Sequence, residues 1–154
     1  RPRDRSSQLV LMKWNHHFKE LNLSSKASYR FYTDSFGVSS STLGLELVKP
    51  LANGWTVTPS VRYFTQNKAN FYFDPPFPNG QKNGSYYSTD QRLASVAGLT
   101  LGAKISKQLS PDSSIDFKLE TYQQNKNLFL GSGASQGLSD LRATIFQIGY
   151  SVRF

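Results

Sequence analysis

The stretch FQIGYSVRF, Phe146 to Phe154, alternates apolar and polar residues without a break. Apolar or aromatic side chains occupy every second position, and glutamine, glycine, serine and arginine stand between them. Because successive side chains of a β-strand point to opposite faces, this pattern predicts a strand with one apolar and one polar face. The same period of two recurs along the chain, and no apolar stripe at helical spacing persists. The sequence therefore predicts an all-β fold.

The alternation predicts seven strands of roughly 10 to 14 residues, near or above the 9 to 11 that a tilted strand needs to cross a bilayer. Their predicted ranges are residues 8–18, 23–34, 39–49, 55–66, 93–107, 114–124 and 141–154. Asn53-Gly54 predicts a tight turn, because both residues tolerate a positive φ. Pro59 predicts a bulge or a sheet edge, since proline cannot donate a ladder hydrogen bond.

The connections between the predicted strands differ in length. We expect brief turns after the first, third and fifth strands and longer loops after the second, fourth and sixth. Two of the long loops cover about residues 67–91 and 125–140. This asymmetry is typical of outer-membrane barrels, which have short periplasmic turns and longer extracellular loops.

The composition is consistent with one domain that has a thin conventional core. The chain has 154 residues, of which 38% are hydrophobic and 14% aromatic, and it has no cysteine. No apolar run approaches the length of about 20 residues that a transmembrane helix needs. The formal charge of +8 indicates an anionic partner, which could be nucleic acid, phosphorylated lipid or an anionic solute.

Alternation alone does not say which face is outside, because a soluble barrel hides its apolar face and a membrane barrel exposes it to lipid. Charges of both signs on the polar face favour a wet lumen; they are Arg30, Glu46, Arg62, Lys104, Asp116, Lys118 and Glu120. Aromatic residues near strand ends favour a bilayer interface, where such rings are enriched; they are Trp14, Phe18, Trp55, Tyr150 and Phe154. We therefore expect an outer-membrane barrel.

The end of the chain resembles the C-terminal signal that the barrel-assembly machinery of bacterial outer membranes recognises. The matching positions are Gln147, Gly149, Val152 and Phe154. The motif is short, but its place at the last residue increases its weight.

A wider resemblance covers most of the chain. The segments that carry it are residues 14–16, 28–32, 58–66, 71–74 and 90–93. They resemble the C-terminal portion of the bacterial family called domain of unknown function 3570. This resemblance implies an outer-membrane barrel considerably longer than this chain, and it implies no established activity.

The strand count indicates that the predicted barrel is larger than these residues. Bacterial single-chain barrels have an even number of strands and usually keep both termini in the periplasm, whereas seven strands would place Arg1 outside. An open sheet would also leave two unpaired edges in lipid. We therefore expect residues 1–154 to be the C-terminal part of a barrel that further N-terminal strands complete.

The sequence predicts no enzyme, no cofactor and no metal site. His16 and His17 are neighbours on a strand and point to opposite faces, so they cannot converge on one ion. No G-x-S-x-G turn is present. Asp116 and Glu120 lie too far apart along a strand for paired acid and base chemistry, and they are expected to pair with Lys118, Arg62 or Arg30.

The basic charge has three possible roles. A stacking platform for nucleic acid is not expected, because strand geometry separates Tyr29 and Phe31 from Arg30 and Tyr32. Lumen cations could favour anions. Cations near the outer rim could bind lipopolysaccharide phosphates; they are Arg1, Arg3, Arg5, Lys68, Lys82, Arg92, Lys126 and Arg142.

The sequence thus predicts an integral outer-membrane β-barrel protein, either a pore or the membrane collar of an envelope assembly. As partners we expect outer-membrane lipid, the barrel-assembly machinery, and a plug or partner protein. The alternative is a soluble, basic β-barrel that binds a ligand or nucleic acid.

Overall fold

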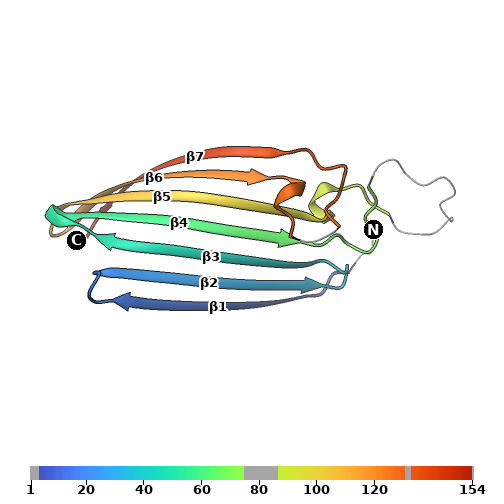
Figure 1. Ribbon diagram of the computed structural model, residues 1–154, viewed down its shortest axis with the longest axis horizontal. Helices are drawn as coiled ribbons and strands as arrows, with labels where there is room; N and C mark the ends of the chain where they lie inside the picture. The colour runs from blue at the N-terminus through green and yellow to red at the C-terminus, as the bar shows by residue number, and fades with distance from the viewer. Residues whose placement is uncertain (1–3, 75–86, 131–132, 154) are drawn as a thin grey trace.

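The computed structural model describes residues 4–74, 87–130 and 133–153, which form one antiparallel sheet of seven strands (Figure 1). Each strand pairs with its neighbours in the sequence, in the order β1 to β7. The bounds are β1 Ser7–Phe18, β2 Leu23–Asp34, β3 Ser39–Pro50, β4 Trp55–Gln66, β5 Val96–Ser110, β6 Ser113–Gln124 and β7 Leu141–Val152. Short 3₁₀ turns lie at Ala52–Gly54, Gln91–Leu93 and Lys126–Leu128.

The two ends of the sheet differ. We name the turn end after its short connections, residues 19–22, 51–54 and 111–112, and the loop end after residues 35–38, 67–95 and 125–140. The N-terminus lies near the loop end and the C-terminus near the turn end (Figure 1). At the turn end, Asn53 and Gly54 have φ angles of 59° and 72°, which confirms the predicted tight turn.

The predicted strand ranges agree closely with the structure, but the predicted alternation of connections is wrong at one place. The connection of β2 to β3, residues 35–38, is no longer than the turns at residues 19–22 and 51–54. It is short because Asp34 organises it as a tight turn: its carboxylate accepts hydrogen bonds from the backbone N–H groups of Phe36 and Val38 at 2.9 and 3.1 Å.

Pro59 lies in the interior of the sheet, so its prediction as a possible edge residue is wrong. It is in register with Ala103 of β5. Between β3 and β4, the residues between Glu46 and Lys49 have no paired partner. The register of the two strands is nevertheless the same on both sides of this gap. The sheet thus accommodates the missing N–H of the proline by a local interruption instead of a bulge.

The predicted barrel is not closed in this chain. Along the described residues, β1 pairs only with β2 and β7 only with β6, so each end of the strand order is an open edge. What the structure shows is an all-β, up-and-down antiparallel sheet.

The buried apolar core lies at the loop end. It consists of Phe36, Val38, Ala69, Phe71, Tyr72, Leu93 and Ala94. The rings of Phe36 and Phe71 meet edge to face with 5.2 Å between centroids, and the Ala69 N–H donates to the Leu93 carbonyl at 2.8 Å. Leu93 belongs to this core, and β5 therefore begins three residues later than predicted.

Candidate functional site

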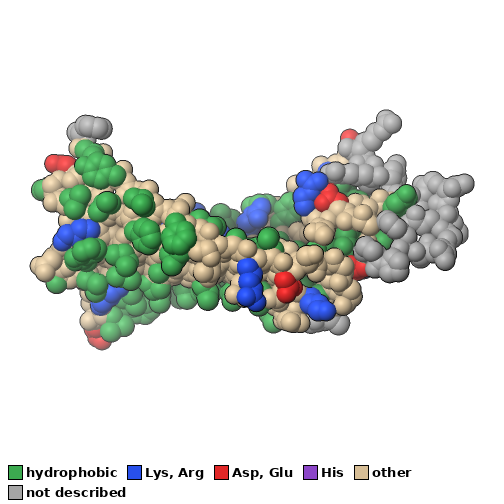
Figure 2. All heavy atoms as spheres, turned by 90° about the horizontal axis from the view of Figure 1, so that it is seen from above, with side chains coloured by type: hydrophobic (Ala, Val, Ile, Leu, Met, Phe, Trp, Pro, Cys, Tyr) green, Lys and Arg blue, Asp and Glu red, His purple; other side chains and the backbone are tan. Residues whose placement is uncertain are grey.

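One face of the sheet, which we call the apolar face, exposes large hydrophobic side chains along every strand. In β7 the exposed fractions are 66% for Phe146, 77% for Ile148 and 65% for Tyr150, and Trp14 of β1 is 71% exposed. Figure 2 shows hydrophobic side chains gathered toward the turn end in the view over β7. So much exposed apolar area is unusual for a protein surface in water and marks a contact with lipid or with another protein.

The apolar residues form a band that slants across the strands. The apolar residues of β2 are centred on Tyr29. Following the paired residues across β3, β4 and β5, the row that contains Tyr29 reaches β6 at Gln123. The apolar residues of β6 are centred on Phe117, six positions nearer the turn end than Gln123. Six residues cover about 20 Å along a strand and four strand spacings cover about 19 Å, so this part of the band slants by roughly 45°.

The outermost strands show the same trend with a smaller slope. Trp14, the middle of the apolar run of β1, is in register with Thr144 of β7. The apolar run of β7, from Phe146 to Val152, is centred about five residues nearer the turn end, which gives a slant of roughly 30° over six strand spacings.

The opposite face, which we call the polar face, holds all of the charged residues that were predicted to share a face. The register places Arg30, Glu46, Arg62, Lys104, Asp116, Lys118 and Glu120 on this side. The predicted pairing of Glu120 with Lys118 is confirmed by a distance of 3.0 Å between Oε1 and Nζ. The structure brings no ion pair to Asp116 among the described residues; its carboxylate lies against Gly149 instead.

Glycines on the polar face make room for these side chains. A Cβ atom at Gly149 would lie 2.4 Å from Oδ2 of Asp116, and one at Gly102 would lie 2.6 Å from Oγ of Ser60 and 3.0 Å from Cγ of Glu120. This role was not predicted, although a glycine inside a strand can mark the close approach of a neighbour.

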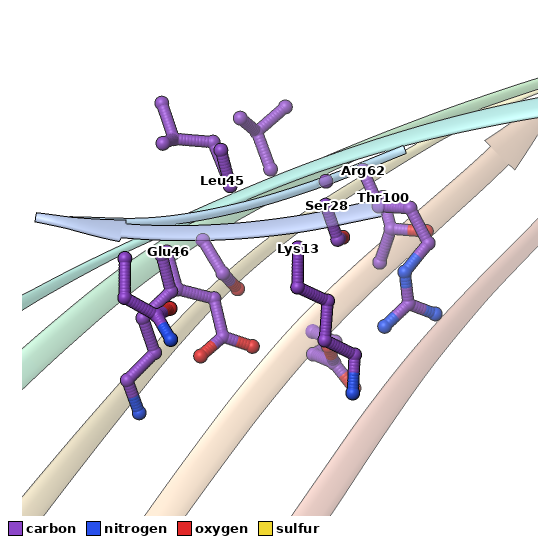
Figure 3. Close-up of a pocket in the computed structure, with 13 residues that line it drawn as sticks. Lys13, Ser28, Leu45, Glu46, Arg62 and Thr100 are labelled. Carbon is purple, nitrogen blue, oxygen red and sulfur yellow. The ribbon is translucent and has the colours of Figure 1, made fainter. Parts of the chain in front are cut away.

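A hollow of about 360 Å³ lies at the centre of the polar face. Its lining includes Lys13, Ser28, Glu46, Arg62, Thr100 and Glu120, from six strands. Figure 3 shows the side chains of Lys13, Glu46 and Arg62 on one side of the sheet and that of Leu45 on the other. Lys13 and Ser28 were not predicted; only the strand register could have placed them beside Arg62.

The predicted interfacial aromatic residues all lie on the apolar face where the structure describes them. Phe18 ends β1, Trp55 begins β4, and Tyr150 is close to the end of β7, so these three are at the turn end. Trp14 lies farther from the turn end, opposite Ala27. Phe154 lies outside the described residues.

The residues of the predicted C-terminal signal divide between the faces. Gln147 and Gly149 lie on the polar face opposite Lys118 and Asp116, and Val152 lies on the apolar face opposite Ser113. Whether assembly machinery recognises them stays a prediction.

The two histidines point to opposite faces, as predicted. The His16 ring packs edge to face on Phe18 with 4.5 Å between centroids, and His17 Nδ1 lies 3.0 Å from the Ser24 hydroxyl. Among the described residues, no group of three or more histidine, aspartate and glutamate side chains is arranged to hold a metal ion.

Asp34 fixes the loop end of the sheet and was not predicted. Its side chain is fully buried, and besides the two backbone N–H groups it accepts hydrogen bonds from Nε of Arg5 at 2.8 Å and from the Tyr32 hydroxyl at 2.9 Å. Burial raises the pKa of the Asp34 carboxyl, but the bonds from Arg5, Tyr32 and the backbone outweigh burial, and the net pKa lies below the ordinary value.

Several of the predicted rim cations are already paired within the protein. Besides Arg5, Arg92 binds Asp90 at 2.7 Å and Lys68 lies 3.8 Å from Asp74. In the described part of the chain, Lys126 and Arg142 form no ion pair. Arg1, Arg3 and Lys82 lie outside the described residues.

A family model covers nearly the whole chain. Its description is a protein of unknown function, DUF3570, and it matches residues 1–152. The chain belongs to this family. No curated protein and no solved structure shows a significant match. Within the described residues, no helix is both long enough and apolar enough to cross a membrane.

Proposed function

We propose that this DUF3570 chain forms part of the wall of a bacterial outer-membrane β-barrel, with its apolar face toward lipid and its polar face toward a wet lumen. The observation that carries this proposal is the slanted apolar band. Strands of membrane barrels are tilted by about 35–45° to the bilayer normal. A band that follows the bilayer must therefore cross the strand register at a similar angle, and the observed slant of roughly 30 to 45° matches this expectation.

A soluble barrel also has tilted strands, so its interior layers would cross the register at a similar angle. Its apolar face, however, would be turned inward, where apolar side chains pack against one another across the interior. The exposure of Trp14, Phe146 and Ile148 also favours a nonaqueous surrounding.

The two open edges support a wall that is completed by other strands. In lipid, each unpaired N–H or C=O group of an edge costs several kcal/mol, so β1 and β7 both need a partner strand.

The first candidate role is a pore. The hollow on the polar face is lined by lysine, arginine, glutamate and hydroxyl side chains, which suit a hydrated passage. The test is the full-length protein in planar bilayers, where we expect stable conductance steps. Recovery from cells without detergent, in the aqueous fraction, would contradict a membrane location and favour the soluble ligand-binding barrel.

The second candidate role, a membrane collar around a plug or partner protein, is favoured by apolar residues on the polar face of the edge strands. Leu9 and Leu11 of β1 and Leu141 and Ile145 of β7 lie on this face and are 43 to 51% exposed. A lumen that holds only water would not be lined in this way. Purification in mild detergent should then yield a bound protein or lipoprotein, and no conductance. A conducting barrel with no bound partner would exclude the collar.

A further inference from the structure

We propose that the hollow on the polar face binds a phosphate group, either as inorganic phosphate or as part of a small organic phosphate. This inference rests on the proposed function, because it assigns a solute class to the lumen of the barrel.

Three cations, Lys13, Lys26 and Arg62, line this hollow, and Lys13 and Arg62 reach it from opposite sides. Lys13 and Arg62 stand at the ends of one row of the register, Lys13–Ser28–Gly44–Arg62. The row spans three strand spacings, about 14 Å between the outer Cα atoms, so both long side chains can contact one ligand that lies between them. Figure 3 shows both side chains on the same side of the sheet, extending away from it.

Between Lys13 and Arg62, the sheet carries small or polar side chains. Ser28 and Gly44 are small, and a Cβ atom on Gly44 would lie 2.8 Å from Oγ of Ser28. Thr100 is in register with Arg62 and also lines the hollow. The hydroxyl groups of Ser28 and Thr100 can donate hydrogen bonds to ligand oxygens.

The acidic residues of the hollow have basic neighbours of their own. Glu120 is paired with Lys118 at 3.0 Å, and Glu46 lies directly opposite Lys26 on β2. Lys13 and Arg62, by contrast, form no hydrogen bond or ion pair with any described residue. Their charges are therefore available to a ligand.

The available groups suit a phosphate better than a halide. A guanidinium group offers two parallel N–H donors to phosphate oxygens, an ammonium group adds a point charge, and hydroxyl groups satisfy further oxygens. The hollow, at about 360 Å³, also has room for a small organic group beside the phosphate.

The test measures binding directly, by isothermal titration calorimetry of the full-length protein in detergent or nanodiscs. The probes are inorganic phosphate, glycerol 3-phosphate and chloride. We expect both phosphates to bind and chloride to show no heat. Tighter binding of glycerol 3-phosphate would identify an organic phosphate as the ligand, and equal or weaker binding would identify inorganic phosphate.

The variants Arg62→Gln and Lys13→Gln should each weaken phosphate binding by about tenfold or more, because each removes a charge-assisted hydrogen bond. Lys104→Gln is the matched control, since it removes the same charge from the same face outside the hollow, and its affinity should stay within about twofold. Native folding of each variant is checked by its electrophoretic mobility with and without heating.

Absence of phosphate binding to the unmodified protein, or equal affinities of Arg62→Gln and Lys104→Gln, would overturn the site. If the protein conducts but does not bind phosphate, the pore is supported and the phosphate site is excluded. If the protein binds phosphate but does not conduct, the phosphate site is supported and the pore is excluded.

Discussion

The two faces of the sheet are built from the same strands, yet they follow different rules. On the apolar face, the apolar run of each strand has its own position, and this position shifts toward the turn end from β2 to β6. On the polar face, charged residues occur from Arg30 near the loop end to Asp116 near the turn end, with glycines beside them. Under the proposed function, the bilayer would constrain the apolar face as a flat external layer, whereas local contacts between side chains constrain the polar face.

The largest difference in effect is expected between single charges placed on the two faces of β4. Val61→Arg puts a guanidinium group into the apolar band and should cost about 2–4 kcal/mol of folding free energy in a bilayer. Ser60→Arg, one residue earlier, lies on the polar face opposite Glu46 and should be close to neutral. The measurement is equilibrium unfolding of the full-length barrel in lipid vesicles. Equal costs for the two variants would contradict the assignment of the faces.

The next largest effect is expected at the loop end of the sheet. Asp34→Asn removes a buried charge that accepts five hydrogen bonds and should lower local stability by about 1.5–3 kcal/mol. Hydrogen exchange of residues 35–38 and 67–72 would report it. Asp112→Asn, in an exposed turn at the other end, is the control and should change exchange little.

The pH dependence of this region follows from the lowered pKa of Asp34. The stabilisation is complete above the pKa of an unfolded aspartate, about 3.9, and is lost as the pH falls through the lower folded value. The protection of loop-end amides, relative to their intrinsic exchange rates at the same pH, should therefore fall below about pH 4 in the unmodified protein and change less there in Asp34→Asn. An unchanged acid response in the variant would assign the effect to another group.

The slant of the band can be tested with a pair of residues from one row. The chain has no cysteine, so single-cysteine variants need no background substitution. Tyr29→Cys lies inside the band, and Gln123→Cys, in register with it, lies toward the loop end of the band. In lipid vesicles, a water-soluble maleimide should label Gln123→Cys faster. Equal rates would mean that the band is level, and the barrel would lose its main support.

The smallest effect is expected from a charge on the polar face. Glu120→Gln weakens the pair with Lys118, whose side chain is 31% exposed, and should change stability by about 1 kcal/mol or less. Thr121→Gln is its counterpart on the apolar face of the same strand. If Glu120→Gln lowered the free energy of unfolding more than Val61→Arg in the same assay, the proposed roles of the two faces would be contradicted.

Most of the strand pattern could be predicted because it depends on short-range alternation. The bounds of β2 and β4 are as predicted, and the charged residues from Arg30 to Glu120 do share a face. The start of β5 was less predictable, because Leu93 continues the alternation but is buried by residues far away in the sequence, such as Ala69.

The hollow and the slant could not be predicted, since both depend on the register between strands. Nothing in the sequence around Lys13 or Ser28 indicates that these residues lie in the same register row as Arg62. The role of Asp34 was accessible in principle, because aspartate often accepts hydrogen bonds from backbone N–H groups a few residues later in a turn.

The strand order has a consequence for how the sheet forms in time. Every strand pairs with its neighbour in the sequence, so most pairings close a short loop and can form soon after the previous one. The longest connection is the step from β4 to β5, which must also pack residues 69–72 against Leu93 and Ala94. Assembly should therefore proceed as two rapid units, β1–β4 and β5–β7, with the slow event between them.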